Sequence, residues 1–94
     1  MKLSFARSAT KHRVSRASAR FVIEHAGMWI KLPPPRGSFD LRDERLVFLG
    51  DDQNGHAIEI MAVAVSDYEL LVIHAMALRA RFHDEYMELK KWQT

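Results

Sequence analysis

The alternation of apolar and polar residues divides the chain into a helical start, a central group of short strands and a helical end. Residues 5–14 are compatible with a helix. Ser15 can then cap a second helix over residues 16–25, in which apolar side chains recur on one face. Gly27 supplies a stop signal for that helix. The start of the chain therefore predicts a helix, a turn and a helix.

Four short apolar runs follow, separated by turn-forming sequences. They predict strands at residues 28–32, 45–49, 56–65 and 69–75. Three consecutive prolines at residues 33–35 mark a loop, and Asn54-Gly55 is a hairpin signal. Residues 66–68 reverse the chain before the last run. From Leu78 onward the apolar residues take a helical period, which predicts a C-terminal helix.

The predicted fold class is α+β: two N-terminal helices, a small antiparallel sheet of three to four strands, and a C-terminal helix. We expect a single domain over residues 1–94, because a chain of this length cannot support two independent cores. No apolar stretch approaches the length that a membrane span needs, so no membrane partner is predicted. The absence of cysteine fits a reducing cytoplasm and excludes a thiolate nucleophile.

Charge is distributed unevenly along the chain. The first twenty residues hold six Lys or Arg and no acidic residue, although the net charge of the whole chain is only +2. This asymmetry indicates a polyanionic partner such as nucleic acid, or an acidic protein. The alternative is an ordinary solvated face. The candidate phosphate contacts in this segment are Lys11, His12, Arg13 and Arg16.

Two ionisable residues interrupt otherwise apolar strands. Glu59 lies within the run 56–65, and His74 lies within the run 69–75. A two- or four-residue hairpin loop between the runs places both side chains on one face of the sheet, and a three-residue loop places them on opposite faces. On one face they would form an acid–base couple, and on opposite faces each is a strand residue with local hydrogen bonds.

A further set of candidates lies near the C-terminus. Arg79, His83, Tyr86 and Lys90 have the spacing of one helix flank. Such a row is suited to hold a phosphate at Arg79 and to exchange a proton through His83, with Tyr86 stacking or hydrogen bonding. The alternative is an amphipathic helix whose polar side carries these residue types without a role.

Other site classes find no support in the sequence. The five histidines show no HExxH or HxxxH spacing, so no metal site and no cofactor is predicted. No Gly-rich phosphate loop and no G-x-S-x-G nucleophile motif is present. The methionines at 28, 61, 76 and 87 favour core filling, with cover of a homodimer or partner interface as the alternative.

Three segments taken in order resemble the BrnT-like toxins of bacterial type II toxin–antitoxin systems. They are Lys11-His-Arg-Val-Ser15 at a helix start, Arg45-Leu-Val-Phe-Leu-Gly50 before a strand that follows Gly55, and Val72-Ile-His-Ala75 leading into a helix with Tyr86. The resemblance implies a RelE-like fold and a metal-independent ribonuclease. It also implies a cognate antitoxin of the DNA-binding ribbon-helix-helix type.

The chain departs from the family pattern at its charged positions. Met76 stands where the family has an arginine, and Phe82-His83 stands where the family has Glu-Arg. Phosphate clamping would then fall to Arg79, Arg81 or His83.

Two hypotheses follow from the sequence. The first is a cytoplasmic RNA-binding toxin, with endoribonuclease activity an open question, whose candidate catalytic residues are His74, His83, Glu59 and Tyr86. The second is a non-enzymatic interaction module, in which the basic N-terminal segment binds nucleic acid or an acidic protein partner.

Overall fold

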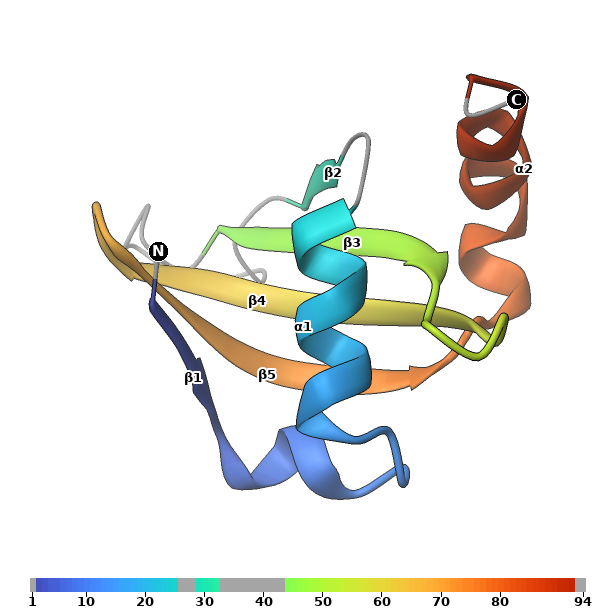
Figure 1. Cartoon of the computed structure of the whole chain (residues 1–94). Helices are drawn as coiled ribbons and strands as arrows, with labels where there is room; N and C mark the ends of the chain where they lie inside the picture. Colours follow the sequence, from blue (N-terminus) through green and yellow to red (C-terminus); the bar gives the residue numbers. More distant parts are fainter. Residues whose placement is uncertain (1, 26–28, 33–43, 93–94) are drawn as a thin grey trace.

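A computed structural model describes residues 2–25, 29–32 and 44–92. It is a mixed α+β fold in which two α-helices flank one five-stranded sheet (Figure 1). The elements in chain order are β1 (Lys2–Phe5), the 3₁₀ helix η1 (Arg7–Thr10), α1 (Arg16–His25), β2 (Trp29–Leu32), β3 (Arg45–Asp51), β4 (Ala57–Ser66), β5 (Glu69–Ala77), the 3₁₀ helix η3 (Ala80–Phe82) and α2 (His83–Trp92).

The sheet has the strand order β1-β5-β4-β3-β2. Strands β2 to β5 pair antiparallel with their neighbours in sequence, as expected for short connections. Strand β1 lies at the opposite edge from β2 and pairs parallel with β5, with Lys2 opposite Glu69 and Phe5 opposite Val72. The first and last strands in chain order, β1 and β5, are therefore neighbours in the sheet.

The predicted N-terminal architecture is wrong. Residues 2–5 form a strand and residues 7–10 form only a 3₁₀ turn, so α1 is the one α-helix of the described N-terminal segment. The reason is the open edge of β5, whose backbone groups need partners. Strand β1 supplies them, and the ladder continues where the Ala6 N–H donates to the Val72 carbonyl at 2.9 Å. The prediction of three to four antiparallel strands fails for the same reason.

Helix α1 forms over the predicted residues. Ser15 caps it, since its Oγ accepts a hydrogen bond from the Ser18 N–H at 3.0 Å. Ala19 and Val22 are buried on its inner face. They pack with Phe48, Ile60 and other sheet residues, so that α1 crosses one face of the sheet (Figure 1). The stop signal at Gly27 lies outside the described residues.

The opposite face of the sheet carries a second apolar cluster. Val47, Leu49 and Met61 from the strands pack with Phe82 of η3 and Leu89 of α2. Helix α2 begins at His83, five residues after the predicted start at Leu78, because residues 80–82 first form a 3₁₀ turn. It stands beside the strand ends at the right of Figure 1.

The β4–β5 hairpin determines which residues share a face. Its loop has two residues, Asp67 and Tyr68, and the ladder then shifts register between Ala64 and Ser66 and again between Met61 and Ala62. The two shifts cancel, so Met61 lies opposite His74 and Glu59 lies opposite Met76. Glu59 and His74 therefore share the face that lies away from α1, which is the two-residue-loop alternative of the sequence prediction.

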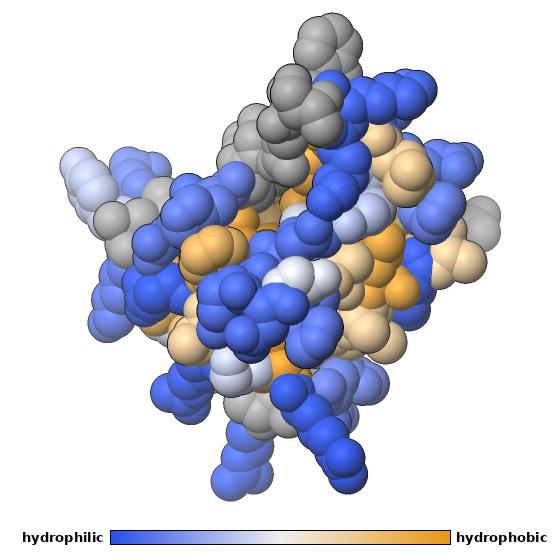
Figure 2. All heavy atoms as spheres, turned by 45° about the vertical axis from the view of Figure 1, so that its right-hand side comes forward, coloured by the Kyte–Doolittle hydropathy of each residue, from blue (hydrophilic) through white to orange (hydrophobic). Residues whose placement is uncertain are grey.

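The face seen in the view toward α2 is mainly hydrophilic, with apolar side chains showing between hydrophilic ones (Figure 2). Met61 is buried in the core, whereas Met87 on α2 is 47% exposed. Met28 and the prolines at 33–35 lie outside the described residues. Within the described part of the chain, no helix has the length and apolar character to cross a membrane.

Candidate functional site

Glu59 is the centre of a charged cluster on the face of the sheet away from α1. Its side chain is fully buried, with 0% of its surface exposed. Its Oε1 accepts hydrogen bonds from the Arg79 backbone N–H at 2.8 Å and from Nε at 3.0 Å. Its Oε2 accepts one from Arg79 Nη2 at 2.8 Å. A two-pronged contact of this kind fixes the guanidinium plane.

The protonation of Glu59 follows from these contacts. Burial acts to raise the pKa of Glu59, but the hydrogen bonds and the charge of Arg79, together with His74, hold it below 4.5. The same hydrogen bonds raise the pKa of Arg79. The pair is therefore a carboxylate and a guanidinium at neutral pH.

His74 lies beside this pair on β5. Its Nε2 is 3.3 Å from Glu59 Oε2, its side chain is 21% exposed, and Nε2 has no hydrogen-bond partner of good geometry. Burial lowers the pKa of His74 below 6.5, the charges of Arg79 and His12 add to this, and Glu59 opposes it. The His74 imidazole is therefore mainly neutral at pH 7 and has a nitrogen that can accept a proton.

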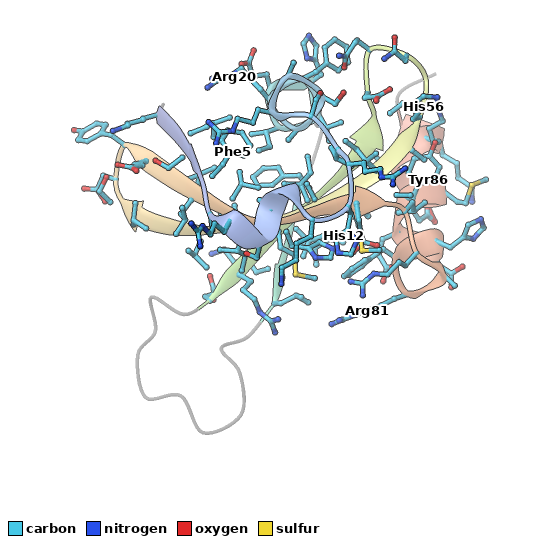
Figure 3. All side chains as sticks on the ribbon, turned by 90° about the horizontal axis from the view of Figure 1, so that it is seen from below. Phe5, His12, Arg20, His56, Arg81 and Tyr86 are labelled. Carbon is cyan, nitrogen blue, oxygen red and sulfur yellow. The ribbon has the colours of Figure 1, made fainter. Side chains whose placement is uncertain are left out.

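His12 joins the cluster from the N-terminal segment. Its ring centroid lies 5.8 Å from that of His74, with the planes tilted by 56°. The segment is held against β5 by η1, where Ser8 Oγ donates to the Ile73 carbonyl at 2.6 Å. In Figure 3 His12 lies toward the face of the sheet away from α1, on the same side as Arg81.

Arg13 redirects the chain directly after His12. Its φ is +62°, in the left-handed region that an L-residue with a side chain seldom adopts. This conformation turns the chain into Ser15 and α1 while His12 stays at the edge of β5. The backbone at Arg13 thus stores strain of about 1 kcal/mol next to the cluster.

Arg79 keeps part of its guanidinium available. Its Nε and one hydrogen of Nη2 bind Glu59, and no described residue accepts a hydrogen bond from Nη1. The side chain is 40% exposed. Glu59 therefore holds Arg79 so that a fixed donor faces solvent near His74, an arrangement suited to an anionic oxygen.

Two of the predicted catalytic residues lie apart from this cluster. His83 is exposed on α2, and its Nδ1 lies 3.9 Å from Asp84 Oδ1. Tyr86 donates its O–H to Asp51 Oδ1 at 2.5 Å, and Lys90 binds the other oxygen at 2.6 Å. The predicted helix flank breaks because Arg79 has extended backbone angles and precedes both η3 and α2.

The remaining predicted phosphate contacts are spread around the cluster. Lys11 and Arg13 are exposed next to His12. Arg16 lies over the Phe5 ring at 5.3 Å, and Arg81 lies over the Phe82 ring at 4.9 Å. The structure thus joins His74, Glu59, Arg79 and His12, leaves Arg81 at the margin, and separates His83, Tyr86 and Arg16 from them.

The contact between His12 and His74 was missed in the sequence. No periodicity links these two positions, since one lies in a turn after η1 and the other in β5. The only indication was that the backbone groups on the outer edge of β5 need hydrogen-bond partners. Beyond β1, the segment that begins at Ala6 and leads to His12 supplies some of them. Among residues 2–25, 29–32 and 44–92, no three His, Asp or Glu side chains gather closely enough to hold a metal ion.

The cluster combines a neutral imidazole, a second imidazole and a fixed guanidinium donor, which are groups that move protons and bind phosphate oxygens. Comparisons with protein-family models, with curated proteins and with solved structures found no match for this chain.

Proposed function

We propose that this protein binds single-stranded RNA and cleaves it without a metal ion at the cluster of His12, His74, Glu59 and Arg79. The observation that carries the proposal is the neutral His74 imidazole, 5.8 Å from the ring of His12 and beside a guanidinium held by Glu59. Metal-free RNA cleavage needs a base, an acid and a cation on the phosphate.

In the proposed reaction the Nδ1 atom of His74 takes the proton of a ribose 2′-hydroxyl, because Nε2 is buried beside Glu59. The 2′-oxygen attacks the adjacent phosphorus and forms a 2′,3′-cyclic phosphate. The bond from phosphorus to the 5′-oxygen breaks, and His12 gives that oxygen a proton. Arg79 Nη1 binds a non-bridging oxygen, where negative charge grows in the transition state. Glu59 acts through other residues, because it fixes Arg79 and faces His74.

The charge of the N-terminal segment supports RNA as the substrate. All six of its Lys and Arg side chains are exposed. Lys11 and Arg13 flank His12, and the other four lie along β1, η1 and α1, where each can neutralise one phosphate. The BrnT-like motifs support a biological setting for the reaction. We accordingly propose a cytoplasmic toxin component, neutralised by a ribbon-helix-helix antitoxin, with homodimer formation as a further expectation.

A second candidate function is RNA binding without cleavage. It is favoured by Met76 and Phe82-His83, which replace family charges, and by the exposed basic segment, which would serve binding alone. The two candidates differ in one respect. Cleavage depends on His74, whereas binding through exposed cations does not.

The test uses purified protein and a 5′-labelled single-stranded RNA in buffer with EDTA. We expect cleavage that leaves a 2′,3′-cyclic phosphate, and we expect His74→Ala to lower its rate at least about 100-fold. His25→Ala is the matched control, since His25 is exposed at the end of α1, where its ring stacks on Phe21 and Nδ1 lies 2.8 Å from the Phe21 carbonyl. Binding with no cleavage by the wild type would favour the second candidate. Absence of both would refute the proposal.

A further inference from the structure

A cleft of about 420 Å³ adjoins the His12 turn on the side toward α1. It lies between the start of α1, the β3–β4 hairpin and the ends of β4 and β5. Its polar wall includes His12, Arg13, Ser15, Asp52, Asn54 and His56. Its apolar wall is formed by Val14, Ala57, Ile58 and Ala77. The volume falls within the range of small-ligand sites.

The two walls of the cleft suit the two parts of a nucleotide. Small apolar side chains such as Ala57 and Ala77 leave a surface on which a flat base can lie. On the other side Arg13 supplies a cation next to the first turn of α1, where backbone N–H groups lack helical partners. The exposed Asn54 side chain carries both donors and an acceptor for a base edge.

The polar wall is held in a fixed shape. Asp52 is 8% exposed. Its Oδ1 accepts hydrogen bonds from the backbone N–H groups of Asn54 and His56, with N···O distances of 2.9 Å each. The hydrogen bond from the His56 N–H is the main cause that holds the pKa of Asp52 below 3.8, and those from Asn54 and the Ser18 hydroxyl add to it, whereas burial acts to raise this pKa. The hairpin thus presents Asn54 and His56 in one arrangement. A preformed wall lowers the entropic cost of binding a ligand.

His12 connects the cleft to the charged cluster. It lines the cleft, and its ring also lies 5.8 Å from that of His74. A phosphate placed between His12 and Arg79 would therefore have a neighbouring nucleotide within reach of the cleft. We propose that the cleft binds the nucleotide next to the scissile phosphate of single-stranded RNA. This inference rests on the proposed function.

The ligand is a single strand because a base must leave its stack to lie in the cleft. A duplex keeps its bases paired and presents only phosphates and groove edges. The exposed cations of the N-terminal segment act on any phosphate chain, whereas the cleft acts on a base. Cleft binding and backbone binding can therefore be separated by substitution.

The test fills the cleft in the His74→Ala background, so that binding is measured without cleavage. Ala77 is exposed at the end of β5, and Ala77→Trp places an indole in the cleft. Ala64→Trp is the matched control, because Ala64 is an exposed strand alanine at the other end of the β4–β5 ladder. Binding of a fluorescein-labelled eight-nucleotide RNA is followed by anisotropy, and folding by circular dichroism.

We expect Ala77→Trp to raise Kd at least tenfold and Ala64→Trp to change it less than twofold. Equal Kd values for both variants would overturn the cleft assignment and leave the proposed function standing. Absence of RNA binding by the parent would overturn the proposed function itself. If Ala77→Trp does not fold, photo-crosslinking of 4-thiouridine RNA decides. Crosslinks at residues 52–57 support the cleft, and crosslinks confined to other segments refute it.

Discussion

Replacing Glu59 by Gln tests how much of the fold depends on the buried carboxylate. Gln keeps the shape and one acceptor, so the Arg79 backbone N–H and Nε retain a partner. Its NH2 group then faces Arg79 Nη2 and leaves that donor, which lies 2.8 Å from Oε2, unpaired. Breaking a buried charge pair costs about 3–5 kcal/mol. Because the Arg79 side chain is 40% exposed, we expect about 2–3 kcal/mol here.

Urea unfolding followed by far-ultraviolet circular dichroism measures this loss as a change in the free energy of unfolding. Asp51→Asn is the control, because Asp51 binds Tyr86 and Lys90 in a partly exposed ion pair. We expect Asp51→Asn to cost much less than Glu59→Gln, since solvent weakens an exposed pair.

A double substitution measures the interaction energy between Glu59 and Arg79 apart from the contribution of each residue alone. Glu59→Met combined with Arg79→Met removes both charges and leaves the backbone N–H of residue 79 without its acceptor. Glu59→Met alone leaves the guanidinium unpaired as well, so the double variant should cost less. A Glu59→Gln cost below about 1 kcal/mol, or additive costs in the double variant, would refute the central role that we assign to this carboxylate.

Three further outcomes follow. The lowered pKa values of His74 and Glu59 mean that the unfolded chain takes up protons first, so unfolding free energy should fall as pH drops below 6.5 and again below 4.5. His74→Ala should flatten the first fall, and stability rising from pH 6.5 to 5 would contradict this. Gly55→Ala should lower the free energy of unfolding by about 1 kcal/mol in urea, because φ is +80°, a conformation that strains any residue with a Cβ. No clash adds to this cost, since the new Cβ would meet no atom within 4 Å, and no loss would show that the turn adapts. Arg13→Gly should leave stability nearly unchanged, because relief of left-handed strain offsets the greater freedom of Gly in the unfolded chain, yet weaken RNA binding. Arg20→Gly within α1 is its control and should lower stability by about 1 kcal/mol.

The sequence predicted correctly those elements whose signals lie within the element itself or in the adjoining turn. The Ser15 cap and the apolar face of α1 were sufficient to find that helix. The turn formers around Gly55 and at residues 66–68 were sufficient to find both hairpins. Strand β1 was missed because its four residues are a strand only through pairing with β5, a partner that lies far along the chain.

The same distinction applies to the candidate site. Glu59 and His74 stood out because each interrupts an apolar strand, and the hairpin then brought them to one face. His12 was selected only for its basic surroundings, and its contact with His74 depends on the unpredicted η1 segment. His83 and Tyr86 were grouped with Arg79 by helical spacing, which does not apply before a helix begins.

The parallel pairing of β1 with β5 also sets an order of folding events. The antiparallel strands β2 to β5 and helix α1 join segments that are near in sequence, so they can form early. Strand β1 gains its hydrogen-bond partner only after β5 has joined the sheet, because Lys2 pairs with Glu69. His12 is carried by the segment that docks last, so a refolding chain should complete most of its sheet before the two histidines meet. The proposed cleavage activity would then return later than the circular dichroism signal of the sheet.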